Sequence, residues 1–286
     1  MVFDPFGDFA SRGYLRNNVG EKDLDKVRRL EHETFRLNLP EALAALAGRP
    51  AVGYQDLLDT HRRLFGVFYP WAGRDRIELA PDRAIGKAGL YDLFAHPLDV
   101  RRAAEFALGL AADPAQMRAR PGEIMGLLAY SHPFLDGNGR TIMTVHADLA
   151  RRAGFQIDWL AIGKPAYLEA LTAELRRPGR ALDAFLAPFV KPAPAEPAAT
   201  VEMLARHPGL GPRGGSAGAV LDALRPAEPP AAEPWDSGAA PLEERLRAFE
   251  RRTTDPAAGE KAPPSPSPAP DAEPPTDPAP RRGPRP

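Results

Sequence analysis

The sequence predicts a mainly α-helical domain followed by a disordered tail rich in proline and alanine. Apolar residues recur at helical spacing in several segments of the first two thirds of the chain. One stretch, residues 74–90, lacks that period and alternates like a strand. Of the 34 prolines, 22 fall from Lys191 onward, where large apolar residues are too sparse to offset chain entropy. We therefore expect one folded domain over residues 1–190 and a mostly disordered tail over residues 191–286.

The first helix is expected over residues 21–37, where Leu24, Val27 and Leu30 share one face. Pro40 should interrupt this helix, because proline lacks an N–H group and clashes with the preceding turn. A separate short helix is then expected to reach Leu46.

The next helix is expected over residues 54–65, which carry one continuous apolar stripe ended by Gly66. His61 lies inside this stripe. A core position therefore explains His61 more simply than a role in a site, which stays the alternative.

Further helices are expected over residues 98–110, 121–131, 140–153, 165–175 and 180–190. Pro121 suits the first turn of its helix, where its missing N–H group costs nothing. His146 lies on the apolar face of the helix that ends at Ala153, so it is expected in the core. Strand content is limited to one hairpin at residues 74–90.

The amino-acid composition limits which partners the protein can bind and which cellular compartment it suits. The formal net charge is −1, so the chain lacks the basic balance of a nucleic-acid binder. It has no cysteine, which excludes disulfides and cysteine metal sites and agrees with a reducing compartment. The first residues do not resemble a signal peptide, and no stretch has membrane-spanning length. We expect a cytoplasmic protein without nucleic-acid or membrane partners, and export as an effector stays open.

The stretch His-Pro-Phe-Leu-Asp-Gly-Asn-Gly-Arg, from His132 to Arg140, concentrates chemistry at the junction of two expected helices. N–H groups at a helix start have no intrahelical partner and can converge on an anion. Glycines leave room for a phosphate to approach the main chain. The expected donors are the N–H groups of Gly137, Asn138, Gly139 and Arg140.

Three side chains of this stretch add to the anion site. Asp136 can hold Mg²⁺, which commonly binds through one or two carboxylates and substrate phosphates. Arg140 can grip a second phosphate as a fork. His132, with a reference pKa near ~6.5, is placed to act as a general base.

These residues resemble the signature of the Fic family, His-x-Phe-x-Asp/Glu-Gly-Asn-Gly-Arg-x-x-Arg. The match is complete through Arg140 and fails at the last position, which is Met143. A second match, His-Arg-Arg-Leu-Phe-Gly and then Tyr-Pro-Trp-Ala-Gly within residues 61–73, extends the resemblance over most of residues 14–190. The resemblance implies a Fic-type helical bundle with a small β-hairpin flap over the active site. That flap, at residues 74–90, would bind the target protein by strand addition.

The activity implied by the resemblance is protein adenylylation, in which AMP passes from ATP to a Tyr, Thr or Ser hydroxyl of a target protein. His132 would be the catalytic base. Mg²⁺ on Asp136, the donors at residues 137–140, the Asn138 amide and Arg140 would stabilise charge on the phosphates. Phe134 would pack under the loop and fix His132.

Met143 leaves alternatives open. In relatives the arginine at this place reaches the terminal phosphate of the donor, whereas a thioether supplies neither charge nor a hydrogen-bond donor. A Fic-fold transferase that uses UMP or phosphocholine donors is one alternative, and a catalytically degenerate binding module is another. The inhibitory motif of many relatives, Ser/Thr-x-x-x-Glu-Gly/Asn, does not occur in the chain. A separate antitoxin therefore stays open as a partner.

Overall fold

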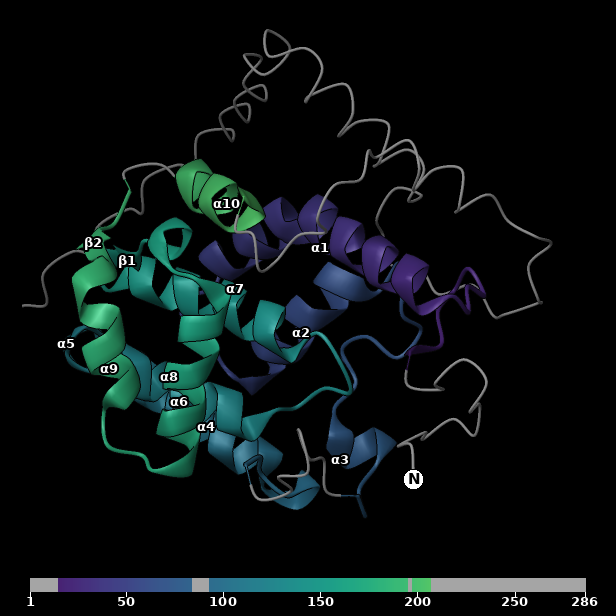
Figure 1. Ribbon diagram of the computed structural model, residues 1–286, viewed down its shortest axis with the longest axis horizontal. Helices are drawn as coiled ribbons and strands as arrows, with labels where there is room; N and C mark the ends of the chain where they lie inside the picture. The colour runs from purple at the N-terminus through teal and green to yellow at the C-terminus, as the bar shows by residue number, and fades with distance from the viewer. Residues whose placement is uncertain (1–14, 84–92, 195–196, 207–286) are drawn as a thin grey trace, which may run out of the picture.

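The computed structural model describes residues 15–83, 93–194 and 197–206, and this part of the chain is mainly helical (Figure 1). The helices are α1 (Leu24–Ala47), α2 (Tyr54–Phe65), α3 (Arg76–Leu79), α4 (Val100–Ala111), α5 (Pro114–Ala119), α6 (Pro121–Ser131), α7 (Asn138–Arg152), α8 (Lys164–Arg176), α9 (Ala181–Leu186) and α10 (Pro197–Arg206). Short 3-10 turns are η3 (Pro97–Asp99), η4 (Trp159–Ala161) and η5 (Ala187–Phe189). Strands β1 (Phe155–Ile157) and β2 (Val190–Pro192) form an antiparallel pair. None of the described helices is both long and apolar enough to cross a membrane.

Helix α7 runs through the centre of the fold. Every residue from Thr141 to Ala150 is buried. Helices α1, α2, α5 and α6 and strand β1 all contact α7, and Figure 1 shows it between α1 and α2 on one side and α6 on the other. The loop that enters α7 is therefore surrounded by the helices that build the core.

Helix α1 does not end at Pro40, contrary to the sequence prediction. The helix continues with Pro40 inside it, and the proline itself is exposed. Leu39 and Ala42, one on each side of it, are completely buried. Packing of both halves on one face of the core offsets the ~3 kcal/mol that an internal proline costs.

The expected strand at residues 74–90 is also wrong where the structure describes it. Arg76–Leu79 form the single helical turn α3, which begins because the Asp75 carboxylate accepts the Glu78 N–H group at 3.0 Å. Residues 84–92, the rest of the expected hairpin, lie outside the described residues. The antiparallel pair in the described chain is β1 with β2, in which Phe155 lies opposite Pro192.

The folded part continues beyond Val190, the boundary that the sequence predicted. Strand β2 extends to Pro192, and α10 packs against α1. Within α10, Leu204 is completely buried and Thr200 is 3% exposed. Proline content gave the wrong boundary, because the 10 residues of α10 lie in a proline-rich context and still bury one apolar face. Residues 207–286 lie outside the described part.

We expect a chain that ends at Arg206 to unfold at the same temperature as the full chain, and one that ends at Val190 to be less stable. Removing the buried Leu204 side chain alone should cost ~2–3 kcal/mol. Thermal unfolding of both truncations measures this difference. The variant Leu204→Ala in the full chain is the control and should reproduce much of the loss. Equal stability of all four proteins would contradict the docking of α10 on α1.

Candidate functional site

The motif, residues 132–140, begins with a short connection between α6 and α7 and continues into the first turn of α7. Helix α6 ends at Ser131, and His132 then adopts the left-handed conformation with φ 41° and ψ 60°. Gly137 precedes α7 with φ 75°. A Cβ at this position would lie 2.7 Å from Cε2 of Phe65, so the turn requires glycine for both backbone and space.

An aromatic stack supports this loop from below. Phe134 is completely buried, and its ring centroid lies 3.8 Å from that of His61. His61 accepts the Gly73 N–H group at Nδ1 (2.8 Å), and its Nε2 donates to the Asp136 carbonyl oxygen (3.1 Å). Burial lowers the pKa of His61 to about 3, so the ring is neutral. His61 is the core residue that its position in the stripe predicts, and it holds the loop in place.

Asn138 closes the loop with its side chain. Its Nδ2 donates to the Phe134 carbonyl at 2.7 Å, and its Oδ1 accepts the Phe134 N–H group at 2.8 Å. The side chain is 5% exposed. The structure thus differs from the expectation that this amide faces a phosphate, because its hydrogen bonds are used within the turn.

Three main-chain donors are available at the start of α7. Among the described residues, the N–H groups of Asn138, Gly139 and Arg140 have no hydrogen-bond partner. The fourth expected donor, Gly137, gives its N–H group to Asp136 Oδ1 at 2.6 Å. Gly139 is exposed, and a Cβ there would meet no protein atom within 4 Å. Free N–H groups at the positive end of a 15-residue helix suit a phosphate.

Asp136 presents a carboxylate beside these donors. Its side chain is 41% exposed, and Oδ1 lies 4.0 Å from Nη2 of Arg140. No group of three or more His, Asp or Glu side chains that could hold a metal occurs in the described ranges. The residues therefore fit Mg²⁺ only as an ion shared between Asp136 and the phosphates of a bound nucleotide.

Arg140 points into the protein, contrary to the prediction of an accessible arginine that grips a phosphate. It is 9% exposed, and its Nη2 pairs with the carboxylate of Glu31 on α1. Its guanidinium carbon lies 4.8 Å from the centroid of the Phe65 ring. Burial raises the pKa of Glu31 to about 7, against the opposing effect of the Arg140 charge. Nη1 of Arg140 is buried and has no hydrogen-bond partner within the described part of the chain.

Glu31 and Phe94 belong to the site but were missed in the sequence. Glu31 lies four residues after Val27 on the buried stripe of α1, and a charged residue in such a stripe is a readable signal. Phe94 stacks on His132 with ring centroids 3.9 Å apart and planes at 28°. No local pattern marks Phe94.

Two other residues that the sequence singled out lie in the core. His146 is completely buried, donates from Nε2 to the Pro121 carbonyl at 2.8 Å, and has its pKa lowered by burial to about 4. Met143 is 4% exposed and packs in the hydrophobic core. An arginine at position 143 would have to be buried there, which is costly without a partner.

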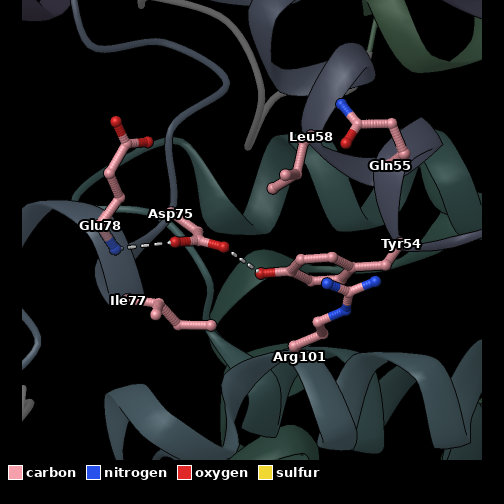
Figure 2. A pocket seen from close by; sticks show the side chains of 7 residues that line it. All are labelled: Tyr54, Gln55, Leu58, Asp75, Ile77, Glu78 and Arg101. Carbon is pink, nitrogen blue, oxygen red and sulfur yellow. Dashed lines mark hydrogen bonds between the residues drawn. The ribbon is translucent and has the colours of Figure 1, made fainter.

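A separate pocket of about 330 Å³ lies between α2, α3 and α4 (Figure 2). The Tyr54 hydroxyl donates to Asp75 Oδ2 at 2.7 Å, and the Arg101 guanidinium carbon lies 5.6 Å from the centroid of the Tyr54 ring. No residue of the motif lines it. Its lining consists of Tyr54, Gln55, Leu58, Asp75, Ile77, Glu78 and Arg101.

Residues 51–149 match the sequence model of the Fic/DOC family. The chain is also 34% identical over 165 residues to the protein adenylyltransferase VbhT of Bartonella schoenbuchensis, which covers 54% of this chain and 32% of that protein. The chain therefore spans about a third of the length of this relative.

Solved structures with the same fold come from Bartonella effector proteins. The N-terminal Fic domain of a VirB-translocated Bep effector from Bartonella quintana has a TM-score of 0.51 at 22% identity, covering 62% of this chain and 88% of that chain. BepC from Bartonella tribocorum, solved with bound AMPPNP, has a TM-score of 0.50 at 17% identity and covers 65% of this chain and 100% of that chain. These similarities establish the fold of the helical domain.

Proposed function

We propose that this chain, whose residues 51–149 match the sequence model of the Fic/DOC family, is an adenylyltransferase that transfers AMP from ATP to a hydroxyl group of a target protein. One observation carries the proposal. Three unpartnered N–H groups at the start of α7 lie beside the exposed carboxylate of Asp136, at the end of the loop that His132 begins. The name of VbhT and the AMPPNP bound to BepC support this class of donor.

The reaction exchanges one phosphorus–oxygen bond for another. The hydroxyl oxygen of a target Tyr, Thr or Ser bonds to the α-phosphorus of ATP, the bond to the bridging oxygen of the β-phosphate breaks, and pyrophosphate leaves. His132 accepts the hydroxyl proton. The N–H groups of residues 138–140 bind phosphate oxygens, whose charge shifts towards the leaving pyrophosphate.

Asp136 is the residue that would hold Mg²⁺ together with the donor phosphates. The ion would supply positive charge that neutralises the phosphates as the bond breaks. Its exposed carboxylate beside the free N–H groups makes this assignment fit the chain.

The family signature has two arginines that can contact donor phosphates, whereas this chain has only the first of them, Arg140. Met143 supplies no charge, and Glu31 already pairs with Arg140. One charge-assisted hydrogen bond contributes ~1.5–3 kcal/mol. Loss of such a contact favours, as a second candidate function, transfer from a donor that lacks the γ-phosphate.

Label transfer from ATP tests the proposed function. Cell lysate proteins are incubated with the full chain and with ATP labelled on either the α- or the γ-phosphate. We expect label on protein from the α-position only, and none with a His132→Ala chain. Transfer of the γ-label would contradict AMP transfer. Transfer only from labelled CDP-choline, which has no γ-phosphate, would establish the second candidate. Transfer only from labelled UTP would show UMP transfer instead, and no transfer from any donor would leave a binding module.

We also propose that the target protein binds at residues 74–90. The described ends of this region adjoin the loop, because the Arg76 N–H group donates to the Pro133 carbonyl at 2.8 Å and Phe94 stacks on His132. A hydroxyl presented there would be near the proposed base. Cross-linking from a photoreactive residue at position 82 should capture the labelled target, and capture only from position 206 on α10, which packs on α1, would refute this placement.

We expect Gly139→Ala to weaken ATP binding by about tenfold or more without loss of stability. The added methyl group meets no protein atom, and alanine favours the helix by ~0.5–1 kcal/mol. Only a ligand that approaches the main chain would be excluded. Calorimetry with ATP and thermal unfolding measure the two effects. Gly109→Ala, on α4 and equally open, is the matched control, and equal ATP affinity in both variants would contradict a phosphate at this helix start.

A further inference from the structure

Arg76 is a completely buried arginine whose hydrogen-bond partners are main-chain carbonyl groups. Its Nε donates to the His132 carbonyl at 2.7 Å, and its Nη2 donates to the Ala95 carbonyl at 2.7 Å. Its own N–H group donates to the Pro133 carbonyl at 2.8 Å. Burial lowers the pKa of Arg76 to about 10, so it remains a cation at neutral pH.

This cation lies where α6 ends. The last carbonyl groups of a helix have no intrahelical partner and form the negative end of its dipole. Residue 132, which follows α6, is in the left-handed conformation that favours glycine, yet it is a histidine. Arg76 holds the carbonyl group of this same residue, so it opposes relaxation of His132 to an ordinary backbone conformation.

The main chain on both sides of this contact, at Arg76 and at Ala95, is itself held in place. Asp75 caps α3 and accepts the Tyr54 hydroxyl at 2.7 Å, which ties α3 to α2 (Figure 2). On the other side, Ala95 donates its N–H group to the Tyr130 carbonyl at 2.9 Å. Phe94, the residue before Ala95, stacks on the ring of His132. Arg76 thus joins both ends of the intervening segment to the turn that carries the histidine.

We infer that Arg76 is a positioning residue for His132, which it holds in the left-handed turn with the imidazole against Phe94. This inference rests on the proposed function for its effect on turnover. The completely buried side chain of Arg76 acts through the main chain of His132 and contacts neither nucleotide nor target. Its loss should therefore lower kcat and leave ATP binding nearly unchanged.

The test compares Arg76→Ala and Arg76→Lys with Arg118→Ala in the full chain. Arg118 is the matched control, because its Nη1 also donates to a carbonyl group, that of Ala153 at 2.7 Å, at the opposite end of α7. We expect kcat of AMP transfer to fall at least tenfold in both Arg76 variants, with KM for ATP within about twofold of wild type. Millimolar guanidinium should restore part of the rate of Arg76→Ala. Arg118→Ala should lose stability but keep kcat.

A second measurement does not depend on activity. The ring proton signals of His132 in NMR spectra report its stacking on Phe94, and they should move towards free-histidine values in the Arg76 variants but not in Arg118→Ala. If Arg76→Ala does not fold, Arg76→Lys decides both readouts. Unchanged His132 signals with unchanged kcat would overturn the inference, as would equal losses in the Arg118 control. A wild-type chain without any transfer would refute the proposed function, and the NMR comparison would still judge the role of Arg76.

Discussion

His132→Ala should abolish transfer while the protein stays folded. A positioned base contributes ~10²–10⁴-fold to such a reaction. The histidines of the core, His61 and His146, cannot replace it, because both are completely buried and hydrogen-bonded inside the core. Label transfer should fall to background. ATP affinity, measured by calorimetry, should change little, because the N–H donors at the start of α7 do not depend on this side chain.

The left-handed backbone at position 132 requires a second variant. Asparagine tolerates this conformation better than alanine does, so His132→Asn separates loss of the base from strain in the turn. Both variants should be inactive and should bind ATP like wild type. Full activity in a folded variant of either kind would remove His132 from the role of base.

Glu31→Ala should destabilise the protein by ~3–5 kcal/mol, because it leaves the buried cation of Arg140 without its partner. The two residues lie on α1 and α7, and both are more than nine-tenths buried. Such a loss is a large share of the ~5–15 kcal/mol by which a domain is stable. Urea unfolding measures it. A bound anion would compensate the unpaired charge, so ATP should raise the melting temperature of this variant more than that of wild type.

Two comparisons make the Glu31 result specific. Glu33 on the same helix is 6% exposed, but its nearest cation, on Arg36, is 3.8 Å away and its Oε1 has no hydrogen bond among the described residues. Glu33→Ala should therefore cost little or nothing. Removing both charges in Glu31→Ala/Arg140→Met should recover much of the stability. A cost for Glu33→Ala as large as for Glu31→Ala would mean that buried volume, and not the ion pair, sets the effect.

Local signals in the sequence located several of the helices and the loop, but not α3, α5 or α10. Helices α2 and α6 have the bounds expected from their apolar period and from Gly66 and Pro121. The family signature identified the loop from His132 to Arg140 because its residues are consecutive. The roles of Asn138 and Arg140 were not readable in the same way, since both depend on what their side chains contact.

The misses share one cause, which is contact between distant parts of the chain. Glu31 meets Arg140 across 109 residues, and Arg76 meets His132 across 56. In each pair, the sequence around one residue does not indicate which distant residue it contacts. Tertiary packing also outweighed local preference at Pro40, which lies inside α1. It did so again in α10, where Leu204 is buried against residues from other parts of the chain.

The two ends of the segment after α3 meet at one place, and this bears on how new specificities can arise. Arg76 binds the Ala95 carbonyl directly, and both residues are fixed to residues 130–133. A segment whose two ends are fixed at one point can change in sequence or length without displacing the residues that hold those ends. Residues 80–92 could therefore be exchanged for those of another transferase, and we expect the hybrid to modify a different protein with the same chemistry.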